Sequence, residues 1–381
     1  YLFVQLHQPS AFYSVNSKKL GNDIIDKVGW NKGLHELATS DEVLSYYDQV
    51  LNQHFLPSGR VQYFPNCNYE GDGKFVSMLS GKSFQMAGSS TRIVDFTYMR
   101  VKVPSMGPPA YQVASGVSFV TPNSLSKVSQ PFANFTIVGA GKTGIDACLW
   151  LLSRGIDVSK LTWIMPRDSW LFDRSESQPG PEFAAKSLSV IPTQIEAIMA
   201  ATSVNNLLKR LEGAQHLMRI NDDVWPTMFR CASVSVAEFE QLKKITNIVR
   251  QGRACQQVFS AAFIAHIEAA YSDDEMKNRL CRPIPHPGQD FDWLVMTCLN
   301  FENTMRWHAQ PETVKWLSQA RLDWVGAMLA TASTDGDSAT DQDPVQAMAP
   351  KIYAACEKLK DLLAELPPKD AERVKAQIID A

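Results

Sequence analysis

The sequence lacks several features that would assign a protein class at once. Its seven cysteines include no CxxC pair, so the sequence indicates neither a redox dithiol nor a zinc knuckle. No apolar run approaches the ~20 residues that a membrane-spanning helix requires. The 37 basic and 40 acidic residues nearly balance, at a formal net charge of −3, which argues against nucleic acid as a partner. No signal-peptide pattern stands out and the cysteines are widely spaced, so we expect a cytoplasmic protein with reduced thiols.

The composition and length are those of an ordinary globular protein with more than one domain. The chain has 381 residues, of which 45% are hydrophobic, and this length predicts two or three domains. We expect residues 1–130 to be rich in strands with one helix, and residues 131–250 to form a nucleotide-binding domain with a helical extension. Residues 251–331 are expected to be helical, and residues 332–344 to be an acidic linker. Residues 345–381 are expected to form one or two terminal helices, broken at Pro367-Pro368.

Short strand patterns dominate the first region. Apolar residues recur at helical spacing between Val43 and Phe55, which predicts one helix. Strand-like runs follow at residues 60–64, 74–79, 91–98 and 112–120. The turn residues Gly71-Asp72-Gly73 and Ser80-Gly81-Lys82 separate them. The pattern predicts a meander of antiparallel strands. Further along the chain, residues 181–330 are predicted to be mainly helical, with one short strand at 245–249. Ser235 and Glu238 have the spacing of a capping box, which predicts the start of a helix there.

The motif with the clearest chemistry is Gly139-Ala140-Gly141-Lys142-Thr143-Gly144, which fits GxGxxG. A β-prone run precedes it at 135–138, a helical pattern follows it, and a second strand is predicted at 161–165. In such a βαβ unit Gly139 permits the tight turn, Gly141 lets a pyrophosphate approach the backbone, and Gly144 lets the helix pack close to the strand. The sequence therefore predicts a dinucleotide site; the alternative is a tight turn that binds nothing. A P-loop is excluded because Thr136 stands where that motif requires glycine.

The residues after the second strand bear on which dinucleotide is bound. Arg167 can accommodate a ribose 2′-phosphate, whereas an acidic residue such as Asp168 binds the 2′-hydroxyl of NAD. We favour NADP(H), with NAD(H) as the alternative. A surface salt bridge from Arg167 to Asp168 or Asp173 is the alternative role for that side chain.

Residues 135–147 and 161–174 resemble the NADPH-binding part of flavin-dependent monooxygenase-like proteins, within the wider group of flavoproteins that have two dinucleotide-binding domains. Residues 6–15 are similar to the segment that follows the FAD fingerprint in that group, and residues 258–268 and 277–281 are similar to its carboxy-terminal part. The resemblance implies an α/β fold, in which a Rossmann-type NADP-binding domain is inserted in an FAD-binding domain, plus a helical carboxy-terminal region. It implies that NADPH reduces FAD and that the reduced flavin activates O₂ to oxygenate a small-molecule substrate. It places His7, Gln8, Ser10 and Tyr13 near the flavin.

The sequence departs from that group in its FAD-binding part. The amino-terminal GxGxxG is absent from the sequence, and the F-x-G-x-x-x-H fingerprint is not matched, because His266 follows Phe259 by seven residues. A flavin-free protein that binds NADP(H) in a structural or sensing role is therefore the alternative function. A dehydrogenase that uses a single cofactor is a weaker third reading. The sequence assigns no catalytic residue, indicates no metal site, and is compatible with a homo-oligomer.

Overall fold

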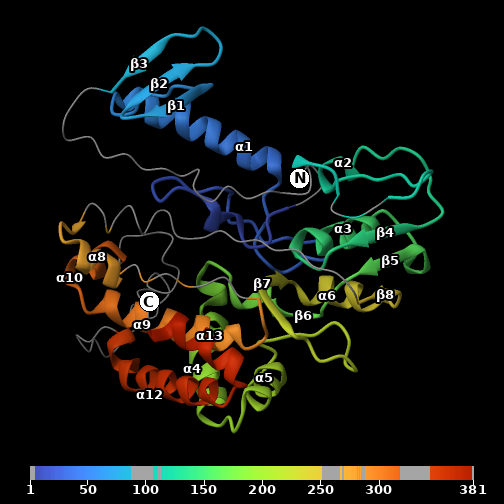
Figure 1. Ribbon diagram of the computed structural model, residues 1–381, viewed down its shortest axis with the longest axis vertical. Helices are drawn as coiled ribbons and strands as arrows, with labels where there is room; N and C mark the ends of the chain where they lie inside the picture. The colour runs from blue at the N-terminus through green and yellow to red at the C-terminus, as the bar shows by residue number, and fades with distance from the viewer. Residues whose placement is uncertain are drawn as a thin grey trace. The chain divides into compact units, whose positions relative to one another are not determined.

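The computed structural model describes residues 5–86, 113–250, 270–280, 288–317 and 344–379, together with residues 106–109, 111, 267, 282 and 284. Its contacts divide the chain into two compact units, Ser40–Ser124 and the combination of Tyr1–Thr39 with Leu125–Ala381. The region predicted as one β-rich part is thus divided, because its first 39 residues belong to the same unit as the chain from Leu125 onward. The protein is of the mixed α/β class, as predicted (Figure 1).

The smaller unit combines one helix with a small antiparallel sheet. Helix α1 (Ser40–Gln49) continues into a π-helical turn at Val50–Phe55, which confirms the predicted helix. Strands β1 (Cys67–Gly71), β2 (Lys74–Ser77) and β3 (Ser83–Gln85) pair in the order β1-β2-β3. The predicted turns lie between these strands, and residues 71–73 all have positive φ angles, which glycine tolerates best. The two predicted turns and the predicted strand at 74–79 are therefore confirmed, whereas β1 and β3 were not predicted.

Two of the predicted strands in this unit are wrong. Residues 60–64 and 113–120 have no regular structure. Residues 60–64 are exposed, and Phe64 packs through its ring against Phe75 and Phe84, with centroids 4.7 and 5.2 Å apart, so apolar content here reflects ring packing rather than strand pairing. The strand predicted at 91–98, His266 and the acidic linker 332–344, apart from its last residue, lie outside the described residues.

A parallel three-stranded sheet forms the centre of the larger unit. Strands β4 (Phe135–Val138), β5 (Leu161–Ile164) and β8 (Ile248–Val249) lie in the order β4-β5-β8. Helix α3 (Lys142–Ser153) connects β4 to β5 and lies beside them in Figure 1. The βαβ unit predicted from the sequence is confirmed. Gly155, with a φ of 79°, lies just beyond the helix, where a left-handed residue commonly ends the last turn.

A second pair of parallel strands was not predicted. Strands β6 (Ser169–Asp173) and β7 (Met228–Val234) pair across more than 50 intervening residues. Most residues of β7 are buried, so its sequence shows no alternation between apolar and polar side chains. The sequence of β7, Met-Phe-Arg-Cys-Ala-Ser-Val, shows neither the alternation of a half-buried strand nor a continuous apolar run, so periodicity does not identify it as a strand. The expectation of mainly helical structure over residues 181–330 was therefore incomplete.

Helices and a second hydrophobic core complete the larger unit. One core surrounds the parallel sheet and includes the fully buried Trp163 and Cys148. The other lies among α4, α5, α9 and α12 and includes the buried Trp170 and Trp293. The terminal helices are separated at Pro367-Pro368, as predicted. The helices that follow α3 are α4 (Ala184–Met199), α5 (Val204–Gly213), α6 (Val236–Lys243), α8 (Asp274–Leu280), α9 (Asp292–His308), α10 (Pro311–Leu317), α12 (Pro344–Ala364) and α13 (Pro368–Ile379).

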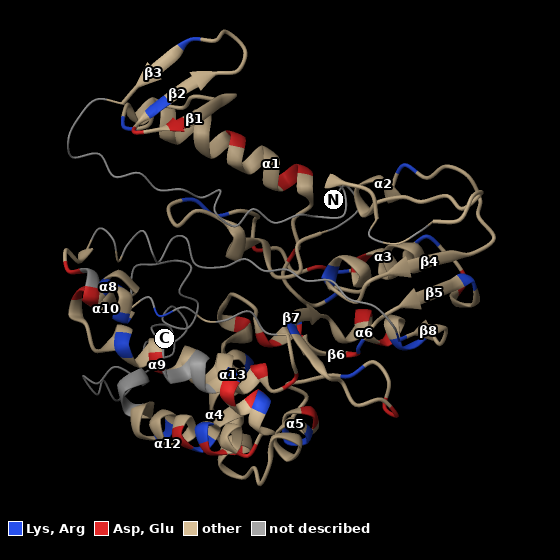
Figure 2. Ribbon diagram, in the orientation of Figure 1, with Lys and Arg blue, Asp and Glu red and all other residues tan. Residues whose placement is uncertain are grey.

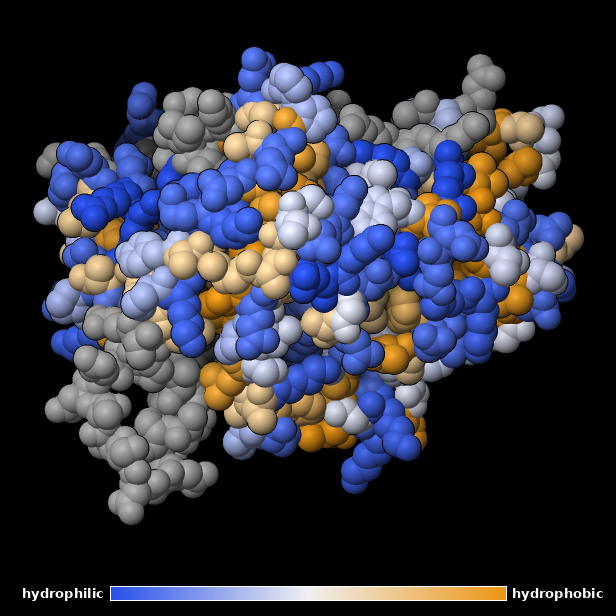
Figure 3. Space-filling view, turned by 90° about the horizontal axis from the view of Figure 1, so that it is seen from below, coloured by the Kyte–Doolittle hydropathy of each residue, from blue (hydrophilic) through white to orange (hydrophobic). Residues whose placement is uncertain are grey.

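The surface mixes charges and small apolar areas. Figure 2 shows basic and acidic residues interspersed along the labelled helices, α12 and α5 among them. On the face drawn in Figure 3, hydrophobic side chains form small patches between hydrophilic ones. Among the helices in the described part of the chain, none is both long and apolar enough to cross a membrane. In the sequence, the short helix α2 (Pro122–Leu125) spans the boundary between the two units.

Candidate functional site

The glycine-rich turn joins β4 to α3 and is fixed to the sheet by hydrogen bonds. Gly139 has a φ of 114°, a conformation that L side chains rarely adopt. Its N–H donates to the carbonyl of Ile164 over 2.9 Å, and its carbonyl accepts from the indole Nε1 of Trp163, also over 2.9 Å. Both the N–H and the carbonyl of Gly139 are therefore hydrogen-bonded to residues of β5. Ala140, the next residue, is buried against the sheet.

The other two glycines differ sharply in what surrounds them. A Cβ atom on Gly144 would lie 2.2 Å from the carbonyl oxygen of Gly139, so only glycine allows α3 to approach the strand this closely. A Cβ atom on Gly141 would meet nothing within 4 Å, and its φ of −74° suits any residue. The fold thus requires glycine at 144 but not at 141. Open space above the backbone of Gly141 is what a closely approaching pyrophosphate needs.

Helix α3 begins directly at this open position. Gly141 is its N-cap, and no side chain caps the first turn. The first N–H groups of a helix have no partner within the helix and, with the helix dipole, attract anions. Lys142 and Thr143, both half-buried, are the first two residues of α3, so their N–H groups face the open side of the turn. The predicted residues 139–144 therefore form one contiguous turn at a helix N-terminus, an arrangement at which proteins commonly bind anions.

Lys142 forms an ion pair with Asp146, one helical turn along α3. The two side chains are only 19% and 13% exposed. Burial raises the pKa of the Asp146 carboxyl above its usual value, and the ammonium of Lys142 opposes that shift. An anion bound at the turn would therefore compete with Asp146 for the Lys142 ammonium.

The amino-terminal segment brings His7 and Tyr13 to the same end of α3. The Tyr13 hydroxyl lies 3.2 Å from Nδ1 of His7. Burial, together with the positive charges of Lys142 and Arg174, lowers the pKa of His7 to about 3. Burial raises the pKa of Tyr13 to about 12. Both groups are therefore neutral at ordinary pH and paired with each other.

The remaining predicted residues of this segment serve packing. Ser10 is 2% exposed, and its hydroxyl donates to the carbonyl of Glu36 over 2.9 Å. Gln8 is half-buried in the bend between His7 and the turn at Ser10–Tyr13. Ser10 thus fixes the segment to residue 36 and does not present its hydroxyl to a ligand.

A buried arginine that no sequence motif indicated holds this region together. Arg174 is 1% exposed, and its guanidinium donates to the carbonyl of His7 (2.9 Å), Oδ1 of Asn31 (2.9 Å) and Oε2 of Glu238 (2.6 Å). Ser235 and Glu238 form the N-terminal capping box of α6, as their spacing predicts, and this fixes the carboxylate that Arg174 reaches. A pocket of about 170 Å³ lies between Arg174, Glu238 and the Lys142–Asp146 pair.

The residues that follow β5 are placed differently from the sequence-based expectation. Arg167 donates to Oε1 of Gln289 (2.6 Å), to the carbonyl of Gly288 (3.1 Å) and, at 3.4 Å, to the carbonyl of Thr227. Asp168 is instead bound by Arg250, in a two-bond pair at 2.6 and 3.1 Å. The other acid considered as a partner for Arg167, Asp173, pairs with Lys186 at 2.9 Å.

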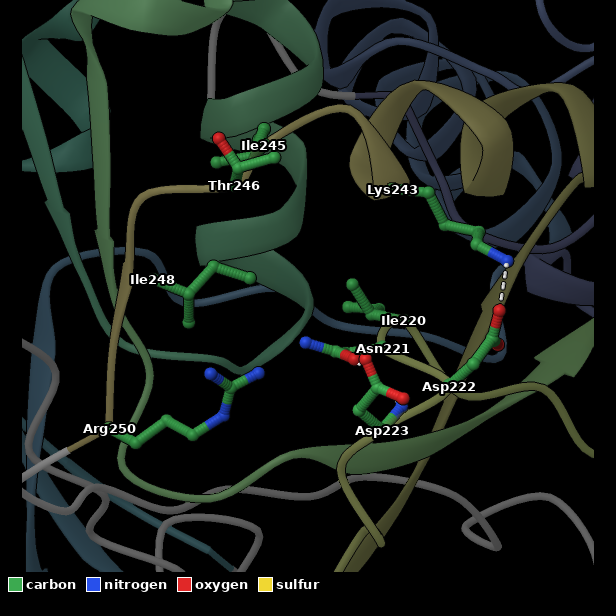
Figure 4. A pocket seen from close by; sticks show the side chains of 9 residues that line it. All are labelled: Ile220, Asn221, Asp222, Asp223, Lys243, Ile245, Thr246, Ile248 and Arg250. Carbon is green, nitrogen blue, oxygen red and sulfur yellow. Dashed lines mark hydrogen bonds and ion pairs between the residues drawn. The ribbon is translucent and has the colours of Figure 1, made fainter.

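A larger pocket of about 280 Å³ opens beside β8 (Figure 4). Three isoleucines give it aliphatic walls, while Asn221 and Arg250 extend polar groups into it. Its remaining lining residues are Asp222, Asp223, Lys243 and Thr246, of which Lys243 and Asp222 form an ion pair at 3.4 Å. Within the described part of the chain, no group of three or more His, Cys, Asp or Glu residues is arranged to hold a metal ion.

Comparison with known proteins finds close relatives of undetermined function. The chain is 46% identical over 385 residues to the uncharacterized protein Rv2000 of Mycobacterium tuberculosis strain H37Rv, an alignment that covers 87% of this chain and 71% of the relative. The uncharacterized proteins MT2056 of M. tuberculosis strain CDC 1551 and Mb2023 of Mycobacterium bovis match to the same extent. No family model matches the chain, and no solved structure matches it significantly.

Proposed function

We propose that this chain, which belongs to the same protein family as these uncharacterized mycobacterial proteins, binds NADP(H) at the turn between β4 and α3 and acts as an oxidoreductase. The observation that carries the proposal is the contrast between Gly144 and Gly141. Packing against Gly139 explains the glycine at 144, whereas no steric contact within the described part of the chain requires a glycine at 141. A ligand that approaches the backbone there does explain it.

The surrounding charges support an anionic ligand at this turn. The pyrophosphate would accept hydrogen bonds from the first N–H groups of α3, and Lys142 would supply a cation once released from Asp146. His7 stays neutral beside Lys142, so it adds no charge and could donate or accept one hydrogen bond. The cofactor would supply hydride chemistry, and the residues named here would hold and orient it.

The flavin implied by the family resemblance is less well supported. Ser10 is buried against residue 36, and His7 and Tyr13 pair with each other, so the described residues 7–13 do not fit the edge of a flavin ring. We therefore derive no step through a flavin. This packing favours the second candidate function, a flavin-free protein that binds NADP(H) in a structural or sensing role.

One spectroscopic experiment separates these functions. The purified full chain would be titrated with NADPH, with quenching of its tryptophan fluorescence as the measure of binding, and its absorption would be recorded between about 350 and 500 nm with and without added FAD. Saturable NADPH binding supports the site, and flavin bands that NADPH bleaches would establish a monooxygenase-like flavoprotein. NADPH binding without any flavin band would favour the flavin-free function. A chain that binds neither NADPH nor NADH would contradict the proposal.

A further inference from the structure

The carboxyl ends of three parallel strands meet at one edge of the central sheet. The glycine-rich turn follows β4, residues 166–168 follow β5, and Arg250 follows β8. Neighbouring strands lie about 4.8 Å apart, so these three segments are adjacent. In open α/β sheets the ligand lies across this edge, and a dinucleotide whose pyrophosphate occupies the glycine turn directs its adenosine ribose toward the next strand. The groups that follow β5 and β8 therefore face that ribose.

Asp168 cannot bind a ribose hydroxyl in this arrangement. Its side chain is 1% exposed, and its two carboxylate oxygens accept from Nε and one terminal nitrogen of Arg250. An acid that follows the second strand favours NAD when it binds the 2′-hydroxyl directly. Here the carboxylate of Asp168 is buried, whereas the side chain of Arg250 remains accessible to a ligand.

Arg250 combines accessibility with unused donors. Its side chain is 31% exposed, and its two bonds to Asp168 use two of the five N–H donors of a guanidinium. Figure 4 shows the guanidinium pointing into the pocket beside β8, toward Asn221. Arg167, in contrast, is directed at three acceptors of other segments, Gln289 and Gly288 among them.

We propose that Arg250, rather than Arg167, binds the 2′-phosphate of the dinucleotide and sets the preference for NADP(H) over NAD(H). The pocket beside β8 then receives the adenosine end of the same ligand. Of its three isoleucines, Ile220 and Ile245 are buried, and the half-buried Ile248 offers an aliphatic surface to a flat heterocycle. Its volume of about 280 Å³ suits one part of a dinucleotide rather than the whole. The carboxylate of Asp223 also lines the pocket, so the phosphate lies on the Arg250 side.

This inference rests on the proposed function, and the test keeps the two apart. Dissociation constants for NADPH, NADH, 2′,5′-ADP and 5′-ADP would be measured by calorimetry on the wild-type chain and on Arg250→Gln. Loss of a charge-assisted bond should weaken NADPH and 2′,5′-ADP by about tenfold or more. NADH and 5′-ADP should change little. Arg167→Gln is the matched control and should not discriminate between the ligands with and without a 2′-phosphate.

A second variant guards against misfolding, because Arg250→Gln leaves the Asp168 carboxylate buried without its cation. The double variant Asp168→Asn, Arg250→Gln removes that charge and should show the same selective loss. Equal weakening of NADPH and NADH, or a selective loss in Arg167→Gln instead, would overturn the assignment of Arg250 while leaving the dinucleotide site in place. A wild-type chain that binds none of the four ligands would overturn both proposals.

Discussion

A pair of glycine substitutions in the turn after β4 separates the requirements of folding from those of binding. Gly144→Ala places a methyl group 2.2 Å from the carbonyl oxygen of Gly139, a distance that real Cβ atoms do not show. That oxygen belongs to the backbone and accepts from Trp163, so it cannot move aside without breaking a buried bond. We expect Gly144→Ala to lower the free energy of unfolding by about 1–3 kcal/mol, the usual cost of an overpacked site.

Gly141→Ala should have the opposite profile. No atom lies within 4 Å of the added methyl group, and the φ of −74° and ψ of 170° are ordinary for alanine. The reduced entropy of the unfolded chain favours the variant by about 0.4–1 kcal/mol. Alanine is a poorer N-cap residue than glycine by a similar amount, so the free energy of unfolding should change by less than about 1 kcal/mol. The same methyl group would occupy the space that the pyrophosphate needs, so NADPH affinity should fall by about tenfold or more, equivalent to ~1.4 kcal/mol.

Urea unfolding followed by tryptophan fluorescence and NADPH titration would be carried out on both variants and on the wild-type chain. The expected outcome is a stable Gly141→Ala protein with impaired NADPH binding and a destabilised Gly144→Ala protein. If Gly141→Ala binds NADPH as tightly as the wild-type chain, the ligand does not approach this backbone and the reasoning fails. An unchanged stability of Gly144→Ala would refute the steric argument for the turn.

Three further predictions follow from the buried polar groups. The pKa of His7 is about 3 in the folded protein and about 6.5 in the unfolded chain. The neutral His7 side chain therefore makes its full contribution to the free energy of unfolding above pH 6.5, and this contribution is lost as the pH falls toward 3. The free energy of unfolding should thus be about 2 kcal/mol lower at pH 5 than at pH 7, and His7→Gln should lack this part of the pH dependence in urea melts. Arg174→Met should cost about 3–5 kcal/mol, because it leaves the Glu238 carboxylate without its buried cation, and a thermal melt within about 1 kcal/mol of wild type would contradict this. Ser235→Ala should cost about 0.5–2 kcal/mol through loss of the capping box of α6, measured by the same melts, with Ser235→Thr as the control that retains a capping oxygen.

The parts of the site that the sequence predicted are those whose chemistry depends on local spacing. Residues 139–144 and the flanking strand and helix patterns predicted the βαβ unit, because one strand, a short turn and one helix are encoded within about 30 residues. The role of Gly144 followed from the same motif. The interpretation of residues 7–13 as flavin-lining depended on a resemblance, and the buried contact of Ser10 with Glu36 gives it no support.

Most of the features that the sequence did not predict depend on contacts between residues far apart in the chain. Arg174 binds groups that lie 167, 143 and 64 positions away, so no spacing rule brings them together. The same holds for Asp168 and Arg250, which are 82 positions apart and meet only because β5 and β8 are neighbours in the sheet. Strand β7 escaped prediction because burial removed its alternation.

The sequence by itself determined the glycine turn, the helix that starts from it, the capping box at Ser235 and the break between the terminal helices at Pro367-Pro368. Each of these follows from backbone stereochemistry or hydrogen bonding among residues a few positions apart. Only the tertiary structure decided which charges lie at the carboxyl edge of the parallel sheet. Burial covered the carboxylate of Asp168 and left the guanidinium of Arg250 accessible, because pairing within a sheet fixes positions that chain order does not encode.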